Sequence, residues 1–280
     1  MPIAHLPDRR FIRVSGSGAE DFLQNLITTD LVSLEPGKAC PGALLTPQGK
    51  ILFDFMIWRD NDGFILEMDM GQQDGLLRRL TMYKLRAPVD LVALEEEGLT
   101  VAWGDEARSE GVMDSRFAKA GISLVRMMTL SVPEAPTGDY ESLRVTAGVA
   151  VSGADFALQD AFPHDVLMDL NDGLSFRKGC YVGQEVVSRM QHRGTARRRV
   201  VQISSDVPLP PSGTEITADG KPVGALGTVR GNAGLAILRI DRVGAALSAG
   251  MPLLAEQVAV TARLPEWTGL SFPAGDEATQ

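Results

Sequence analysis

Short segments of the chain alternate apolar and polar residues with the period of a β-strand, and others repeat apolar residues with the period of a helix. Strands are expected at residues 11–14, 43–45, 50–58, 64–68, 89–94 and 100–103. The second and third of these predict a hairpin across the turn at 46–49. A helix is expected at 74–83, where three leucines make an apolar stripe. Strands and helices mixed with hairpins indicate an α+β fold rather than a doubly wound parallel sheet.

A further helix is expected after Ser17, because Ser17 and Glu20 have the spacing of a capping box and apolar residues then fall on one helical face. The segment Gly16-Ser17-Gly18 is also similar to part of a dinucleotide-binding loop. That interpretation is rejected, because the third glycine is missing and Glu20 with Asp21 would repel a phosphate at the helix start. The segment therefore predicts a capped helix.

The pattern changes after residue 198, where short strands follow one another. They are expected at 200–203, 214–217, 223–229, 235–240 and 258–260. Turn signals between them lie at 208–211, 219–220 and 231–232. Regular spacing of short strands is typical of a small antiparallel barrel or sandwich, here of about 75 residues. We therefore expect a domain boundary near residues 195–198 and a flexible tail over 271–280.

The composition narrows the class of protein. The chain has 280 residues, with 27 Lys and Arg against 36 Asp and Glu, a net charge of −9. A hydrophobic fraction of 44% and a charged fraction of 22% are typical of a globular chain and exclude a disordered one. The acidic balance argues against a protein that coats nucleic acids, because phosphate contacts need Lys and Arg. Two cysteines cannot supply a disulfide framework, and three histidines are too few for most metal sites.

Two further expectations concern location and assembly. The sequence lacks an apolar stretch of about 18 residues, so a membrane span is not expected. The N-terminus has no basic segment followed by an apolar one, so we expect no secretory signal and a cytoplasmic protein. We expect a monomer.

The segment from Arg177 to Arg199 is a basic island in this acidic chain. It holds seven Lys and Arg residues and one acid, Glu185, a net +6, so the remaining 257 residues sum to −15. Such an island favours a specific anion over any polyanion. A solvated face at a domain junction is the alternative, and charge alone slightly favours that alternative.

Cys180 lies inside the island, between two glycines that permit a tight loop. A helix is expected to begin just after it, near Glu185. A thiol near a helix N-terminus with Arg177 and Lys178 adjacent should be more thiolate at neutral pH, which makes Cys180 a candidate nucleophile or redox thiol. The alternative is a small buried apolar residue. Cys40 is interpreted as structural.

The Cys180 loop resembles the signature of the YgfZ family, folate-binding proteins that assist iron–sulfur cluster maintenance. The resemblance is carried by Phe176-Arg177-Lys178-Gly179-Cys180-Tyr181-Val182-Gly183-Gln184-Glu185. Other similar segments lie at 141–150, 162–165 and 189–194, and near the N-terminus at 22–30 and 49–51. The resemblance spans most of residues 10–265.

This family is similar in fold to the glycine-cleavage T-protein, an aminomethyltransferase, so the resemblance implies a three-lobed T-protein-like cloverleaf. Two α+β lobes, interwoven in sequence, would fill residues 1–197, with the outer lobe at roughly 45–120. A C-terminal antiparallel β-barrel would fill 198–270. Tetrahydrofolate, or a one-carbon derivative, would bind in the central opening.

The resemblance also implies folate contacts. Asp165 matches the acid that holds the pterin ring in T-proteins, where Glu is more usual, because a carboxylate accepts two hydrogen bonds from a flat donor pair. Arg144 matches the arginine of an Arg-x-x-x-Gly segment, and an ion pair at a lobe interface is its alternative role. Further implied contacts are Tyr83, Arg86, Arg189 and Arg193, the last two as counter-charges for the glutamate tail of folate.

One departure from the T-protein pattern concerns the acid used near N5 of the folate. T-proteins carry an Asp-Asp pair in the strand after the Gly turn, whereas this sequence has Phe53-Asp54. Asp54 is expected to face the opening. The departure weakens aminomethyl transfer, which depends on that carboxylate to position the amine and its proton.

Two classes of function follow. The first is a tetrahydrofolate-binding accessory factor for assembly or repair of iron–sulfur clusters in client enzymes, including those of tRNA thiolation. Its chemistry would be carried by Cys180, Lys178, Tyr181, Gln184 and Glu185. The second is a folate-dependent aminomethyl- or methyltransferase with Asp54 as its key acid. Direct RNA binding through the arginines at 197–199 is disfavoured by the acidic remainder. The expected partners are folate and iron–sulfur client or assembly proteins.

Overall fold

The structure is a computed structural model that describes residues 2–61, 63–104, 111–128 and 137–273. Residues 105–110 of the expected outer lobe and 274–280 of the expected tail lie outside the described residues. The chain divides into two compact units that alternate along the sequence. The first unit is made of residues 1–140 and 168–186, and the second unit of residues 141–167 and 187–280. The predicted boundary near 195–198 stays a prediction.

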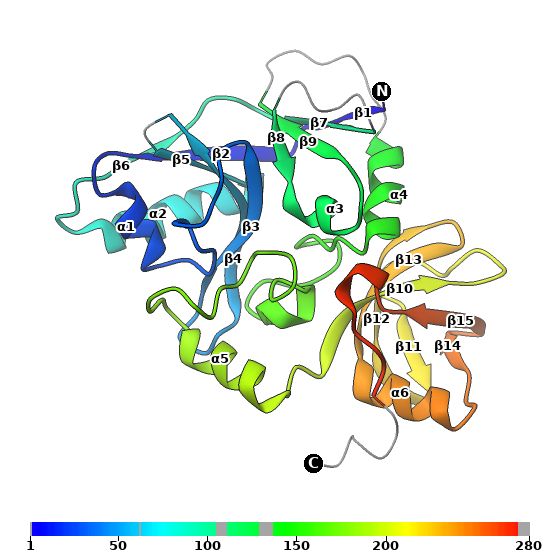
Figure 1. The fold of residues 1–280 in the computed structure, drawn as a ribbon. Helices are drawn as coiled ribbons and strands as arrows, with labels where there is room; N and C mark the ends of the chain where they lie inside the picture. Colours follow the sequence, from blue (N-terminus) through cyan, green and yellow to red (C-terminus); the bar gives the residue numbers. More distant parts are fainter. Residues whose placement is uncertain (1, 62, 105–110, 129–136, 274–280) are drawn as a thin grey trace. The chain divides into compact units, whose positions relative to one another are not determined.

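Within the described residues, the first unit holds a nine-stranded sheet in the order β1-β7-β9-β8-β3-β4-β5-β2-β6 (Figure 1). Its strands are β1 (Ile3–Leu6), β2 (Arg9–Ser15), β3 (Lys38–Leu45), β4 (Ile51–Asp60), β5 (Gly63–Asp69), β6 (Asp90–Ala93), β7 (Leu99–Trp103), β8 (Val112–Asp114) and β9 (Leu124–Met127). Neighbouring strands are antiparallel except β3 and β8, which are parallel. The expected hairpin across 46–49 is confirmed as β3–β4.

The helices of the first unit include the two that the apolar pattern predicted, after Ser17 and at 74–83. They are α1 (Ala19–Gln24), η1 (Met70–Gln72), α2 (Gln73–Lys84), α3 (Ser115–Lys119) and the beginning of α4 (Thr137–Ala147). Ile12 and Val14 of β2 share one apolar core with Leu76 and Leu80 of α2. Alternation thus turns one face of β2 toward α1 and α2 (Figure 1).

The capping box predicted at Ser17 is wrong. α1 begins at Ala19 with Gly18 as its N-cap, and no side chain caps it. Gly18 instead donates its N–H to the carbonyl oxygen of Pro88 at 3.1 Å. At Gly16, which has φ of +100°, a Cβ would lie 2.7 Å from the same oxygen. The glycines therefore allow two stretches of backbone to approach closely, which fits the rejection of a phosphate loop.

Six strands of the second unit close into an antiparallel barrel in the order β10-β13-β12-β11-β14-β15, as far as the structure describes it. Its strands are β10 (Arg198–Ser204), β11 (Glu215–Ala218), β12 (Lys221–Arg230), β13 (Ala233–Arg239), β14 (Leu253–Ala255) and β15 (Val258–Arg263). The remaining elements are η2 (Pro163–Val166), α5 (Gln184–Arg193), α6 (Ile240–Ser248) and η3 (Glu266–Thr268). The sequence did not predict β14 or α6, which packs Val243 and Ala246 onto the barrel core.

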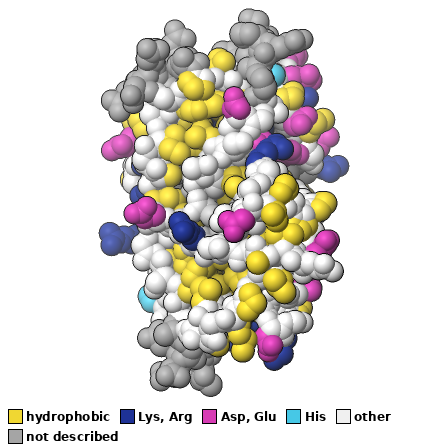
Figure 2. Space-filling view, turned by 90° about the vertical axis from the view of Figure 1, so that its right-hand side faces the viewer, with side chains coloured by type: hydrophobic (Ala, Val, Ile, Leu, Met, Phe, Trp, Pro, Cys, Tyr) yellow, Lys and Arg dark blue, Asp and Glu magenta, His cyan; other side chains and the backbone are white. Residues whose placement is uncertain are grey.

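The predicted fold class, α+β with a C-terminal antiparallel barrel, is confirmed. Among the described helices, none is long and apolar enough to cross a membrane. On the face drawn in Figure 2, Lys and Arg side chains stand apart from one another among acidic and apolar side chains.

Candidate functional site

Cys180 lies in a loop of the first unit that ends where α5 begins at Gln184. Its thiol is exposed and forms no disulfide, so the alternative of a buried apolar cysteine is wrong. Cys40, the only other cysteine of the chain, is 4% exposed in β3. Burial raises the pKa of the Cys40 thiol, which keeps it protonated. One exposed thiol therefore distinguishes this loop.

The Lys178 side chain anchors the loop to the segment 27–29. It is 9% exposed, and its ammonium donates to the carbonyl oxygens of Ile27 at 2.8 Å and Thr29 at 2.7 Å. The same ammonium lies 5.4 Å from the centre of the Tyr181 ring. Burial lowers the pKa of Lys178 to about 8, against the opposing charge of Asp30. The structure thus gives Lys178 an anchoring role, whereas the sequence predicted it among the chemically active residues.

Ser175 organises the loop and was missed by the sequence analysis. Its hydroxyl oxygen accepts the backbone N–H groups of Arg177 and Lys178, each at 3.3 Å. Its carbonyl accepts the Tyr181 hydroxyl at 3.2 Å, and its own N–H donates to the Thr28 carbonyl at 3.0 Å. A serine just before a charged run is a common turn-forming signal and could have indicated this role. Burial raises the pKa of Tyr181, so its hydroxyl stays neutral and acts as a donor.

Two glycines fit the loop against the turn between β3 and β4. Gly183 has φ of +79°, and a Cβ there would lie 2.5 Å from the carbonyl oxygen of Thr46. Gly49 has φ of +78°, and a Cβ there would lie 3.0 Å from the Val186 side chain. Both positions therefore need glycine for conformation and for space. The thiol loop is held by the 27–29 segment on one side and by this turn on the other.

The other predicted residues of the loop and basic island lie along α5. Gln184 is half-buried at the start of the helix, and Glu185 is exposed beside it. Arg189 and Arg193 are exposed further along and belong to the second unit. Glu185 near the N-terminus and Arg193 in the last turn have the charges that the helix dipole favours.

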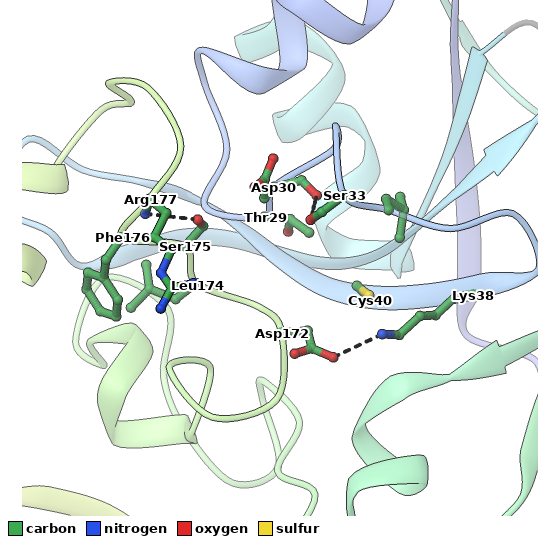
Figure 3. A pocket seen from close by; sticks show the side chains of 11 residues that line it. Thr29, Asp30, Ser33, Lys38, Cys40, Asp172, Leu174, Ser175, Phe176 and Arg177 are labelled. Atoms are coloured by element: carbon green, nitrogen blue, oxygen red, sulfur yellow. Dashed lines mark hydrogen bonds and ion pairs between the residues drawn. The ribbon is translucent and has the colours of Figure 1, made fainter.

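A pocket adjoins the residues that precede the thiol loop (Figure 3). It lies between the segment 29–34, the beginning of β3 and the segment 172–177, all within the first unit. No pattern in the sequence predicts this pocket, because its walls come from segments more than a hundred residues apart in the chain.

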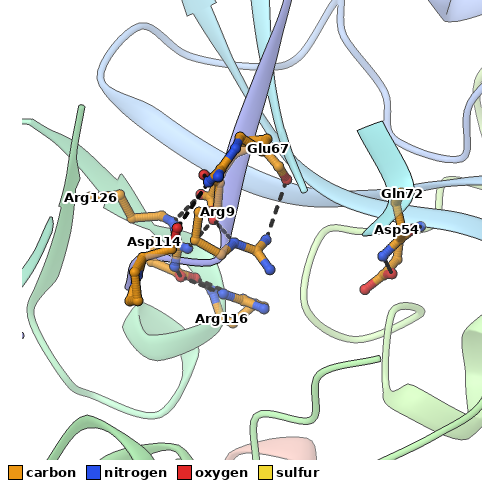
Figure 4. Close-up of polar contacts among 9 residues, drawn as sticks. Arg9, Asp54, Glu67, Gln72, Asp114, Arg116 and Arg126 are labelled. Atoms are coloured by element: carbon orange, nitrogen blue, oxygen red, sulfur yellow. Dashed lines mark hydrogen bonds and ion pairs between the residues drawn. The ribbon is translucent and has the colours of Figure 1, made fainter. Parts of the chain in front are cut away.

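Asp54 is held by Gln72 (Figure 4). The Gln72 amide donates to the Asp54 carboxylate at 2.8 Å, and its oxygen accepts the Asp54 backbone N–H at 3.1 Å. Gln72 is 6% exposed, so the carboxylate is fixed in one orientation. The neighbouring Phe53 packs its ring against α2, where a Cβ at Gly75 would lie 2.9 Å from it. The residue that replaces the second acid therefore has a packing role.

A buried group of charged side chains joins four strands and α3 of the first unit (Figure 4). Glu67 accepts from Arg9 at 2.6 Å and from two nitrogens of Arg126 at 2.6 Å each. Asp114 accepts from Arg126 and from Arg116, both at 2.7 Å. Burial opposes ionisation of Asp114, but the two arginines outweigh it and hold its pKa at about 2. These groups satisfy one another, so we assign them to the fold and not to chemistry.

The predicted folate contacts fall in both units. Asp54, Tyr83 and Arg86 belong to the first unit, where Tyr83 packs on the apolar core and Arg86 is exposed just after α2. Between them, Leu85 has φ of +45° and is 87% exposed.

Arg144 and Asp165 of the second unit do not fit the ligand-facing roles expected of them. Arg144 is 1% exposed, and its five N–H groups all bond within the unit, to Glu141 twice, to Asp155, to Thr228 and to a backbone carbonyl. The ion-pair alternative describes it better.

The Asp165 carboxylate is likewise turned inward. Asp165 is 2% exposed and accepts the Phe162 N–H at 3.0 Å as the cap of η2. It also lies 3.7 Å from Arg198. A carboxylate engaged in this way does not present two acceptors to a pterin ring.

Comparison with known proteins defines the class in two steps. The crystal structure of glycine cleavage system aminomethyltransferase T from Bartonella henselae is similar with a TM-score of 0.67, covering 94% of this chain and 85% of that chain. The sequences are 15% identical, so the likeness shows the fold alone. The family model described as CAF17, C-terminal beta-barrel domain, matches residues 197–270, which contain the closed barrel. The chain is thus an aminomethyltransferase-fold protein with a CAF17-type barrel.

The relatives in sequence are more specific. The iron-sulfur cluster assembly factor IBA57 of Mus musculus is 30% identical over 304 residues, and that of Homo sapiens is 30% identical over 299 residues. Each comparison covers 94% of this chain and 84% of the relative. The homolog from Pyricularia oryzae is 29% identical over 84% of this chain and 71% of its own length. The chain belongs to the IBA57 family, whose members named here are described as iron–sulfur cluster assembly factors.

This membership confirms the expected iron–sulfur family at a coarser level and corrects the expected location. The narrower YgfZ label is not confirmed. The cytoplasmic location predicted from the N-terminus was wrong by this comparison, because these fungal, mouse and human relatives are all described as mitochondrial.

Proposed function

We propose that the chain is an iron–sulfur cluster assembly factor in which the Cys180 sulfur is a ligand of iron while a cluster is transferred to a partner protein. The observation that carries the proposal is a single exposed thiol on a loop fixed by Lys178, Tyr181 and Gly183. Membership of the IBA57 family supports the cluster-related role. The anchored loop presents the sulfur to a partner without requiring the backbone to rearrange.

The number of thiols indicates a transient, shared role. Iron–sulfur clusters are commonly held by four cysteine thiolates, and this chain has two cysteines, of which Cys40 is buried. Cys180 would therefore supply one ligand, and an iron–sulfur client or assembly protein would supply the others. Clients that act in tRNA thiolation remain a narrower prediction of the same proposal.

The test is complementation of cells that lack the homologous factor, read by the activity of a cluster-dependent enzyme. Cys180→Ala and Cys180→Ser should lose the activity, whereas Cys40→Ala serves as the matched control of a buried thiol. Wild-type activity in the Cys180 variants, at equal protein levels, would show that the Cys180 thiol is not required for cluster assembly.

Tetrahydrofolate, or a one-carbon derivative, is a separate proposed ligand that rests on the fold class. The fit of the residues is partial. In the first unit Arg86 is exposed and Tyr83 is half-buried, whereas Asp54 is bonded to Gln72, and Arg144 and Asp165 of the second unit are committed to internal bonds. No chemical step is derived through folate. Titration of wild type, Tyr83→Phe and Asp165→Ala with tetrahydrofolate should show weaker binding in the first variant. Loss of affinity in Asp165→Ala alone would indicate that the Asp165 carboxylate binds the pterin ring.

A folate-dependent aminomethyl- or methyltransferase is the second candidate, favoured by the orientation that Gln72 imposes on Asp54. Phe53 argues against it, because its ring fills space beside α2 at the position of the second acid. Incubation of purified protein with tetrahydrofolate and an aminomethyl donor separates the candidates. Turnover that is lost in Asp54→Asn and retained in Cys180→Ala would favour the transferase.

A further inference from the structure

The pocket beside the thiol loop has the size of a small-molecule site. Its volume is about 480 Å³, within the range of roughly 300 to 1,000 Å³ that ligand pockets occupy. Its inner wall is apolar, formed by Leu34, Cys40 and Leu174, each at most 6% exposed. Its rim carries hydroxyl and charged side chains from the segments 29–33 and 172–177 (Figure 3). A ligand with an apolar body and a polar end matches this lining.

The two carboxylates at the pocket are already balanced by cations. Asp172 forms ion pairs with Lys38 at 3.2 Å and with Lys119 at 3.1 Å. Asp30 accepts a hydrogen bond from the Gln24 side chain at 2.9 Å, and its charge acts on the buried ammonium of Lys178. Lys38 and Lys119 thus neutralise Asp172, and Asp30 is held by Gln24, so neither carboxylate is left to attract a ligand cation.

Arg177 adds a further positive charge at the rim. Its side chain is exposed and has no hydrogen-bond or ion-pair partner among the described residues. Among the described residues that line the pocket, Lys38 and Arg177 balance the charges of Asp30 and Asp172, and Arg177 is the cation without a carboxylate partner. A guanidinium offers paired N–H donors that match a carboxylate.

Ser175 places a second donor in the same wall. Its hydroxyl oxygen accepts two backbone N–H groups, from Arg177 and Lys178, so the hydroxyl proton is left to donate. Because Ser175 also receives the Tyr181 hydroxyl, a ligand bonded to Ser175 would touch the residue that organises the thiol loop.

We propose that this pocket binds a small organic anion by its carboxylate, held by Arg177 and Ser175, with the apolar part of the ligand against Leu34 and Leu174. The carboxylate belongs either to a free metabolite or to the glutamate tail of a folate, and both present the same group to Arg177. The inference does not depend on cluster assembly, because it rests on the lining of the pocket.

The test titrates the full chain with citrate, L-glutamate and folinic acid at millimolar concentrations in low-chloride buffer, followed by heteronuclear NMR. The backbone amides of Ser33, Ser175 and Arg177 should shift in a saturable way. Arg177→Ala should weaken binding by about tenfold or more, because it removes charge-assisted hydrogen bonds. Arg230→Ala, an exposed arginine of the barrel, is the matched control and should bind as wild type does.

The two sources of the carboxylate give different patterns. Citrate or glutamate that binds at least as tightly as folinic acid identifies a free metabolite, whereas folinic acid that binds more tightly than both, with that gain lost in Arg177→Ala, identifies the folate tail. The proposal is overturned if none of the three compounds shifts these amides. It is also overturned if Arg177→Ala, folded by circular dichroism, binds each compound as tightly as wild type.

Discussion

Replacing Arg126 by methionine should lower the unfolding free energy of the first unit by about 3 kcal/mol. The Arg126 side chain is 1% exposed, and it donates two hydrogen bonds to Glu67 and one to Asp114, both 0% exposed. Breaking a buried ion pair by removing one partner costs about 3 to 5 kcal/mol. Arg9 and Arg116 remain on the two carboxylates, so the expected value lies at the lower end.

Amide hydrogen exchange in β5 and β9, the strands that carry Glu67 and Arg126, measures the local free energy of opening. Arg13→Met is the control, because Arg13 and Asp60 form an ion pair at 3.1 Å whose side chains are 44% and 28% exposed. It should change stability by no more than about 1 kcal/mol. The reasoning fails if Arg126→Met loses no more than Arg13→Met does.

A double variant sharpens the test. If Arg126→Met destabilises because it leaves charge uncompensated, then adding Glu67→Gln should restore part of the loss, since one buried carboxylate becomes neutral. Additive destabilisation in the double variant would instead point to lost packing.

The remaining predictions concern the thiol loop and the second unit. Burial lowers the pKa of Lys178 from 10.5 to about 8, so the unfolded chain binds the proton more tightly than the folded chain does. The unfolding free energy of wild type relative to Lys178→Met should therefore rise between about pH 8 and 10, by roughly 2 to 3 kcal/mol. Denaturant titrations at several pH values measure this rise. Gly183→Ala should raise hydrogen exchange across the loop, at a cost of about 1 to 3 kcal/mol, whereas Gly179→Ala, where a Cβ meets nothing within 4 Å, should not. Arg144→Lys should destabilise the barrel unit by about 1 to 3 kcal/mol without weakening folate binding, because three ammonium donors cannot replace five. An unchanged unfolding transition together with weaker folate binding would assign Arg144 to the ligand.

The strands and helices that sequence alone predicted correctly are those with a strong local pattern. Ile12 and Val14 alternate with polar residues in β2, and the leucines of α2 repeat with helical spacing. β14 escaped notice because it has only three residues. α6 escaped although its apolar residues follow a helical spacing, because it begins at Ile240, directly after β13, and the strand predicted at 235–240 included its first residue. The cap predicted at Ser17 failed because backbone contact with Pro88, distant in sequence, decides where α1 begins.

In the candidate site, too, local motifs could be predicted from the sequence, whereas contacts between distant segments could not. The motif around Cys180 identified the loop, and glycine composition indicated its tight turn. The partners of Lys178 lie 149 and 151 residues away, so the sequence could not show that its ammonium serves as an anchor. The sequence allowed Arg144 to be either a folate contact or an ion-pair partner. Its five hydrogen bonds in the structure favour the ion pair. The pocket beside Arg177 depends on segments brought together by the fold.

The bonds from Lys178 to the 27–29 segment also set an order of events during synthesis. A chain emerging from the ribosome presents its N-terminal 140 residues first, then residues 141–167 of the other unit, and only then residues 168–186, which complete the first unit. Until Lys178 emerges, the carbonyls of Ile27 and Thr29 lack this donor. The first unit therefore cannot complete its fold until residues 168–186 have been synthesised. Contacts this far apart in sequence also form slowly. Cys180 is thus anchored only after the main sheet that supports it has been made.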